Sequence, residues 1–122
     1  MFMTPLRAEF SKGDMSAKLL DVLKYNDKKH GIIVVPIGFE TDFASVKGWI
    51  LLPGLVPRVG ILREAAVVHD WLYQTGAKGM SRKDADKIFR RAMQDLGVYW
   101  WRVRLAYRAV RIGGRSSWKG EK

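Results

Sequence analysis

Two amphipathic helical segments joined by a short connection constrain the fold of this chain more than any other feature. The first covers residues 62–74 and should end at Gly76, because glycine is favoured just after a helix. The second covers residues 81–96 and opens with Ser81 and Asp84, whose spacing is typical of a capping box. Because the connection between them is short, we expect two antiparallel helices packed against each other.

The apolar face of the first segment carries residues with titratable or polar ends. His69 and Tyr73 are one helical turn apart, so their polar ends can meet. Asp86 lies early in the second helix, near the end of the first, where it could reach His69 and orient its ring. We therefore predict that His69, Asp86 and Tyr73 are catalytic residues. The alternative is a buried histidine whose hydrogen bonds are satisfied within the core, next to an exposed Asp70.

The remaining elements predict an α+β fold. Residues 18–25 and 32–35 read as two strands joined by the turn 26–31, which is rich in Asn, Asp and Gly. Residues 98–112 read as a third helix. We expect a single domain over residues 1–122, with an N-terminal β-hairpin or small antiparallel sheet packed on a bundle of about three helices.

Composition limits the class of protein. The chain has 122 residues, of which 48% are hydrophobic and 28% charged, as in a globular domain. It has no cysteine, which excludes disulfides and thiolate metal sites and fits a reducing compartment. The first ten residues show no secretory signal pattern, and no apolar run reaches the length of a membrane span.

An ordered, partly apolar loop is expected over residues 36–46, and it carries Thr41, Asp42 and Ser45. One interpretation is that Asp42 and Ser45 cap a following turn. The functional interpretation is that Asp42 points into the same cleft as His69. Asp42, Thr41 and Asp70 are then candidate metal ligands, and their oxygen atoms favour a divalent cation such as calcium.

A nucleophilic triad is a weaker variant of this site. It would use Ser45, His69 and Asp86. Nothing around Ser45 resembles a strained nucleophile elbow, so this variant is disfavoured.

The positive charge is concentrated in the C-terminal third. The net charge is +10, and residues 82–122 hold twelve Lys and Arg against four Asp and Glu. Residues 98–122 form a basic, aromatic helix and tail that suits a protein interface, nucleic acid or an anionic membrane. The alternative is a solvated basic face over core aromatics. The candidate binding residues are Arg102, Arg104, Arg108, Arg111, Trp100 and Trp101.

Four motifs carry a resemblance to a known family. They are VPIGFETDFASV at 35–46, AAVVHDWLY at 65–73, SRKDAD at 81–86 and YRAVRIGG at 107–114. In this order they resemble the family catalogued as domain of unknown function 1353, which is found mainly in bacteriophages and prophages. The resemblance implies a phage- or prophage-encoded protein that works in the bacterial host cytoplasm during infection or is incorporated in the virion. One departure is Lys47, where the family usually has proline.

A shorter resemblance concerns the candidate catalytic residues on the first two helical segments. The motif His69-Asp70-x-x-Tyr73, followed by a helix bearing Asp86-x-x-Phe89, is similar to the two central helices of secreted phospholipases A2. The resemblance implies that His69 activates water, Asp70 binds calcium, Asp86 holds His69 and Tyr73 supports the network. This chain departs from that family in having no cysteine, and its Gly-bearing acidic loop, residues 38–42, lies well upstream of the helix.

Three functions therefore compete. The first is a metal-assisted hydrolase, with a lipid ester as the leading substrate class and calcium as the favoured cofactor. The second is a structural or assembly component of a phage particle, such as a tail or baseplate protein, with the basic C-terminal third as its interface. The third is the binding of nucleic acid or an anionic membrane through residues 98–122. The expected partners are other phage proteins first, and nucleic acid or an anionic membrane second.

Overall fold

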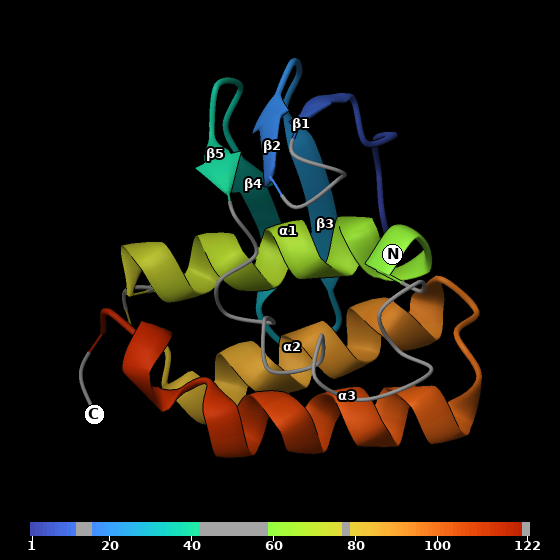
Figure 1. Cartoon of the computed structure of the whole chain (residues 1–122), viewed down its shortest axis with the longest axis vertical. Coiled ribbons are helices and arrows are strands. Elements are labelled where there is room, and N and C mark those ends of the chain that lie inside the picture. The colour runs from blue at the N-terminus through green and yellow to red at the C-terminus, as the bar shows by residue number, and fades with distance from the viewer. Residues whose placement is uncertain (12–15, 42–58, 77–78, 121–122) are drawn as a thin grey trace.

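Three helices form one layer of the fold in the computed structural model, which describes residues 1–11, 16–41, 59–76 and 79–120. They are α1 (Val59–Thr75), α2 (Arg82–Asp95) and α3 (Trp100–Gly113), followed by the short 3₁₀ turn η3 (Arg115–Ser117). Successive helices run antiparallel, with α2 packed against both α1 and α3 (Figure 1). This confirms the predicted antiparallel pair and the third helix.

The start of α2 has the predicted capping box. The Ser81 hydroxyl accepts the Asp84 backbone N–H at 3.1 Å, and the Asp84 carboxylate accepts the Ser81 backbone N–H at 3.2 Å. Two backbone N–H groups that the first turn leaves unpaired are thereby satisfied. This cap sets the first residue of α2 and hence the position of Asp86 one turn later.

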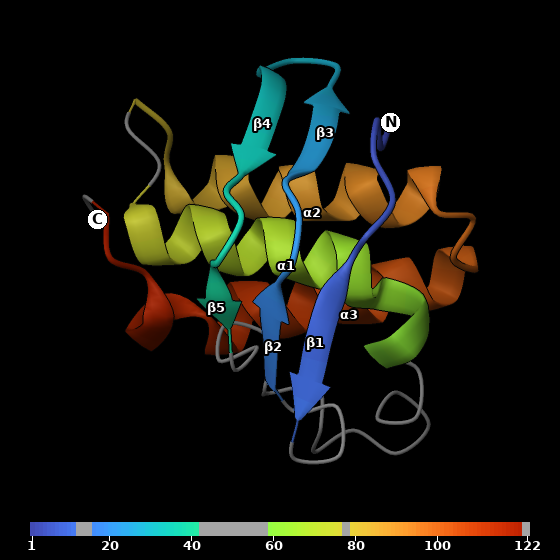
Figure 2. The same cartoon turned by 90° about the horizontal axis from the view of Figure 1, so that it is seen from above.

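Two small antiparallel sheets cover the other side of α1. One has the order β1 (Ala8–Ser11), β2 (Ser16–Leu19), β5 (Glu40–Thr41), and the other is the hairpin of β3 (Leu23–Asp27) and β4 (Gly31–Val35). Seen from above, the strands lie over α1, with α2 and α3 beyond it (Figure 2). The fold is α+β, as predicted, with strands on one side and helices on the other.

The prediction of one continuous strand over residues 18–25 is wrong. The segment divides between β2 and β3, which belong to different sheets. At the break, the Asp21 carboxylate accepts the backbone N–H of Val22 at 2.8 Å, a local hydrogen bond of the kind that competes with sheet pairing. Leu19 and Leu23 are buried on either side of the break, whereas Leu20 is exposed.

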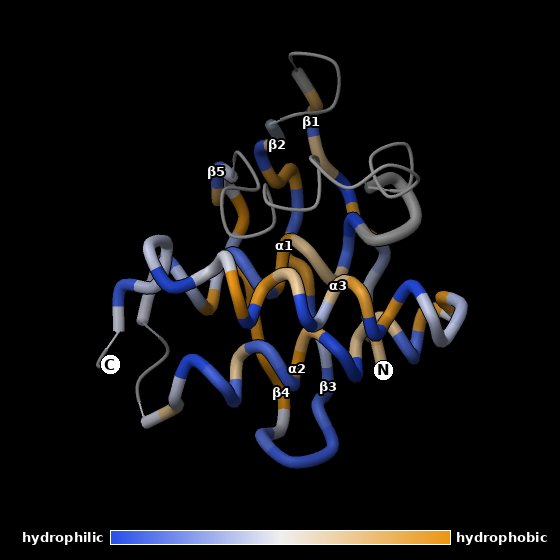
Figure 3. The backbone as a smooth tube through the Cα atoms, turned by 60° about the horizontal axis from the view of Figure 1, so that its bottom comes forward, coloured by the Kyte–Doolittle hydropathy of each residue, from blue (hydrophilic) through white to orange (hydrophobic). Residues whose placement is uncertain are grey.

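The core is made of buried residues from the strands and from all three helices. Hydrophobic and hydrophilic residues alternate along α3 (Figure 3). In α1, six consecutive residues from Ala65 to Asp70 are buried, so this helix is enclosed on every side at that point. His69 and Asp70 are therefore both inside the protein, which corrects the alternative that placed Asp70 at the surface. No helix in the described ranges has the length and apolar character to cross a membrane.

Candidate functional site

The site is built around the carboxylate of Asp86, which α2 presents to α1. One carboxylate oxygen, Oδ1, lies 2.7 Å from His69 Nε2 and accepts the Tyr73 hydroxyl at 2.6 Å. All three side chains are buried. This confirms that Asp86 lies within hydrogen-bond reach of His69 and that the ends of His69 and Tyr73 meet.

Two arginines hold the other side of this carboxylate. Arg111 of α3 donates from Nη1 to Asp86 Oδ2 at 2.8 Å, and Arg82 Nη1 lies 3.6 Å from the same oxygen. Arg82 also donates to the Tyr73 hydroxyl at 3.3 Å and to the carbonyls of Val110 and Arg111 at 3.1 and 3.2 Å. It thereby ties the start of α2 to the C-terminal end of α3, where a cation is favourable. The carboxylate thus joins all three helices.

Arg82 is a member of the site that is not among the residues predicted from the sequence. The sequence spacing could have indicated its contact with Asp86, because Arg82 and Asp86 are one helical turn apart and this spacing favours ion pairs. Arg111 was predicted as part of an exposed binding surface. Its guanidinium instead reaches Asp86, and its side chain is 30% exposed.

Electrostatics keep Asp86 ionised. Burial raises the pKa of this carboxyl, but hydrogen bonds from His69, Tyr73 and Arg111 outweigh it and hold the pKa below its ordinary value. Burial, together with the neighbouring Asp86 carboxylate, raises the pKa of Tyr73, so its hydroxyl stays protonated and donates. Because a carboxylate only accepts, the ring nitrogen that faces Asp86, Nε2, carries a proton and donates it to the carboxylate.

Aromatic rings fix the orientation of the imidazole. The His69 ring packs between Tyr73 and Phe89, with centroid distances of 4.2 and 4.6 Å. Trp118 lies edge-on against Tyr73 at 5.2 Å, and the Lys119 backbone N–H donates to the Tyr73 carbonyl at 3.0 Å. The segment after α3 therefore covers Tyr73.

Asp70 belongs to a neighbouring polar group that faces the sheet. Its Oδ2 atom accepts hydrogen bonds from the Thr41 hydroxyl on β5 and from Gln74 Nε2, the latter at 2.7 Å. Both Asp70 and Thr41 are buried. The structure thus brings together two of the three predicted metal ligands. Asp42 and Ser45 lie outside the described residues, so the predicted approach of Asp42 stays a prediction.

The described residues supply only part of a calcium site. Calcium binds about six to eight oxygen ligands, whereas Asp70 and Thr41 contribute one carboxylate and one hydroxyl. Within the ranges that the structure describes, no group of three or more His, Cys, Asp or Glu side chains is arranged to hold a metal.

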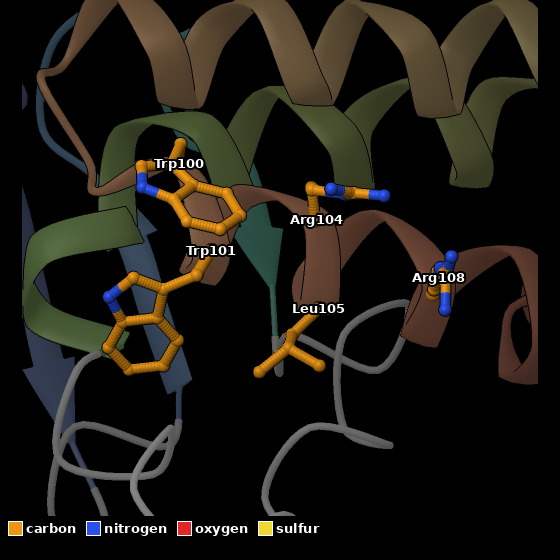
Figure 4. A pocket seen from close by; sticks show the side chains of 5 residues that line it. All are labelled: Trp100, Trp101, Arg104, Leu105 and Arg108. Atoms are coloured by element: carbon orange, nitrogen blue, oxygen red, sulfur yellow. The ribbon is translucent and has the colours of Figure 1, made fainter.

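The predicted binding residues of α3 fall into two sets. Trp100, Trp101, Arg104 and Arg108 are exposed and line one shallow hollow together with Leu105 (Figure 4). Arg102 is half-buried and lies over the Trp101 ring at 4.9 Å, while Arg111 turns to Asp86. The division follows from helical phase, since Val103, Ala106 and Val110 form the buried face of α3.

Comparison with known proteins gives one match. The family described as protein of unknown function (DUF1353) matches residues 17–110, a span that includes His69, Tyr73 and Asp86 and ends one residue before Arg111. No curated protein and no solved structure matches the chain. The family match covers most of the sequence, from β2 into the last turn of α3. The chain therefore belongs to the DUF1353 family of proteins of unknown function.

Proposed function

We propose that this protein is a hydrolase of ester bonds in which His69 is the general base and Asp86 holds it in position. The observation that carries the proposal is the 2.7 Å contact between His69 Nε2 and an Asp86 carboxylate that Tyr73 and Arg111 also fix. A base oriented by a third group is the arrangement that activates water or a nucleophile in many hydrolases.

The chemistry follows from the position of the ring proton. Nε2 donates to Asp86, so Nδ1 takes a proton from water as the water oxygen bonds to the ester carbonyl carbon. The Asp86 carboxylate stabilises the imidazolium that forms. When the carbon–oxygen bond to the leaving group breaks, Nδ1 returns the proton to the departing alkoxide. The products are a carboxylic acid and an alcohol.

The resemblance to secreted phospholipases A2 supports lipid esters as the leading substrate class. The order of these residues supports the proposal: His69, Asp70 and Tyr73 lie on one helix and Asp86 on its antiparallel partner, as in the motif that resembles those enzymes. Asp70, together with Asp42 and Thr41, is where calcium would bind. A calcium ion there would supply positive charge for a developing oxyanion.

A second function is favoured by burial. His69 and Asp86 are both 0% exposed, as expected for a polar network that specifies how three helices pack. In that case the protein would be a structural or assembly component of a phage particle, in the tail or baseplate. The host cytoplasm and the virion are then the proposed locations, and other phage proteins the proposed partners.

The experiment compares the two histidines of the chain. Purified wild type, His69→Gln and His30→Gln would be assayed against carboxylic esters and phospholipids, with calcium, magnesium or zinc and with chelator. His30 lies in the β3–β4 turn and is the matched control. We expect His69→Gln to lower the rate by about 10²- to 10⁴-fold, with His30→Gln unchanged.

Thermal unfolding of the same three proteins separates the two functions. A wild type that hydrolyses none of these substrates under any metal condition would overturn the hydrolase. A His69→Gln variant that stays folded and loses the rate supports His69 as the base, whereas a His69→Gln variant that no longer folds favours the structural network. Calorimetric titration of calcium into wild type, Asp70→Ala and Asp42→Ala tests the metal: identical flat isotherms for all three would remove calcium from the proposal.

A further inference from the structure

Two hollows meet at Trp100, at the start of α3. The larger, about 680 Å³, lies between α2, α3 and the β3–β4 turn, and Lys29, Arg90 and Arg104 line it with Trp100. The smaller, about 280 Å³, lies on the outer side of α3, where Trp100 and Arg104 are joined by Arg108. Figure 4 shows the indole rings of Trp100 and Trp101 at one end of this smaller hollow and Arg108 at the other.

Three of the cations around Trp100 have no carboxylate partner in the part of the chain that the structure describes, whereas Arg91, which also lines the larger hollow, pairs with Asp27. Among the described residues, Lys29, Arg90 and Arg104 have no carboxylate within ion-pair distance. Arg90 lies over the Tyr107 ring at 4.8 Å and Arg104 over Trp100 at 6.0 Å, so aromatic faces hold their guanidinium groups in place. The positive potential of this surface therefore remains available to an anionic ligand.

The aromatic residues at this point are unusually open to solvent. Tyr99 and Trp100 are each 70% exposed and Trp101 is 42% exposed, in three consecutive positions. Exposed apolar surface of this kind marks an interaction site. Indole rings beside cations offer both a stacking platform and a phosphate contact.

The arrangement in space selects among anionic ligands. The cations lie on both sides of Trp100 and come from the β3–β4 turn, α2 and α3. A flat bilayer resting on the outer side of α3 would meet Trp101, Leu105 and Arg108 but would not enter the larger hollow. A nucleic-acid duplex would present phosphates but keep its bases inside the helix. A flexible strand can follow both hollows and stack its bases on the exposed rings.

We propose that this surface binds single-stranded nucleic acid. Phosphates contact Lys29, Arg90 and Arg104, and unpaired bases stack on Trp100 and Trp101. The proposal does not depend on the hydrolase, because none of these side chains belongs to the network around Asp86.

The test measures binding of a fluorescein-labelled oligodeoxythymidylate of about ten nucleotides, a length in the range of single-strand binding sites. Anisotropy reports binding, and quenching of tryptophan fluorescence reports stacking. Trp100→Ala should weaken binding by about 5- to 150-fold. Arg104→Gln should reduce the slope of log affinity against log salt by about 0.7, as expected when one phosphate contact to a single strand is lost. Thermal melting checks that each variant folds.

Arg115→Gln is the matched control. It removes the same charge from an exposed residue at the other end of α3, and it should bind like wild type. Any one of three results would overturn the proposal. These are no binding of the oligonucleotide at low salt, equal weakening by Arg115→Gln and Arg104→Gln, or a duplex that binds as tightly and is indifferent to Trp100→Ala. Phosphatidylglycerol vesicles that bind through Trp100 where the oligonucleotide does not would identify a membrane surface instead.

Discussion

Two buried carboxylates, Asp27 and Asp86, have similar partners but are held in different ways. Each has a side chain that is 0% exposed, and each contacts an arginine and a histidine ring nitrogen. Asp27 accepts two hydrogen bonds from Arg91, at 2.7 and 3.0 Å, and the backbone N–H groups of residues 29 and 30 at 3.1 Å. The donors identified to Asp86 are all side chains, and they come from α1 and α3.

The difference indicates what each carboxylate does. Asp27 is satisfied by its own turn and by the fork of Arg91, so it closes the β3–β4 hairpin and attaches it to α2. Its histidine, His30, has a side chain that is 28% exposed. Asp86 instead holds a fully buried imidazole through one oxygen and keeps that oxygen in place with Tyr73. The same residue types therefore stabilise a turn around Asp27 and orient a candidate base around Asp86.

The largest effect should come from removing Asp86. Asp86→Ala leaves Arg111 and Arg82 without their carboxylate and breaks a buried ion pair, which typically costs about 3–5 kcal/mol of unfolding free energy. Denaturation by urea, followed by circular dichroism, measures it. A loss below about 1 kcal/mol would mean that the three helices pack without this carboxylate, and the contrast with Asp27 would disappear.

Replacement of Asp27 should have a smaller effect that depends on pH. Asp27→Asn keeps an acceptor for the turn but loses the charge that Arg91 contacts, so we expect a loss of about 1.5–3 kcal/mol at neutral pH. Any ester hydrolysis by the wild type should be unchanged, because Asp27 lies outside the network around His69.

The pH dependence of this loss has a definite sign. Burial raises the pKa of Asp27, but hydrogen bonds from Arg91, His30 and the Lys29 amide lower it overall, from 3.8 to about 2. The ionised carboxylate therefore contributes its full stability above about pH 4, and this contribution is lost as pH falls towards 2. Unfolding free energies of wild type and Asp27→Asn should converge over that interval. A difference that stays constant with pH would show that the charge of Asp27 is not responsible.

The smallest effect is expected at the exposed histidine. His30→Gln removes a partly exposed contact to Asp27 of 3.1 Å, and such pairs contribute about 0–1 kcal/mol. His69→Gln should lower the unfolding free energy by more, because its ring is enclosed by Tyr73 and Phe89. Equal losses of unfolding free energy for the two histidine variants would mean that Asp27 and Asp86 hold their histidines in the same way.

Local features of the structure were predictable from the sequence. The capping box at Ser81, the short connection and the apolar periodicity determined where α2 begins and that it runs antiparallel to α1. Helical spacing placed His69 beside Tyr73, and the position of Asp86 in the first turns of α2 brought it within reach of both. These predictions depend only on residues within a helix or across one short loop, so spacing along the chain was sufficient.

Contacts between distant elements were not predictable in the same way. Arg111 is 25 residues from Asp86 and lies on a different helix. The position of Arg111 in the helical pattern of residues 98–112 agreed equally well with an exposed surface. The rotation and position of α3 against α2 decide which of its arginines turns inward, and packing at Val103, Ala106 and Val110 sets that rotation. From the sequence alone, Arg111 and Arg108 could not be distinguished. Both were predicted to bind a partner at the surface, although Arg111 contacts Asp86 inside the protein.

The direction of Asp70 shows the same limit. The sequence by itself determined that Asp70 follows His69 around the helix and must face another side of it. Only the tertiary structure decided that this side is covered by β5, where Thr41 donates to the carboxylate. The strand break at Asp21 was likewise decided by the tertiary structure. Local hydrogen bonding competes there with sheet pairing, and that pairing depends on β1 and β5. Spacing specifies a face of a helix or strand, whereas the partner on that face is specified by how the whole chain packs.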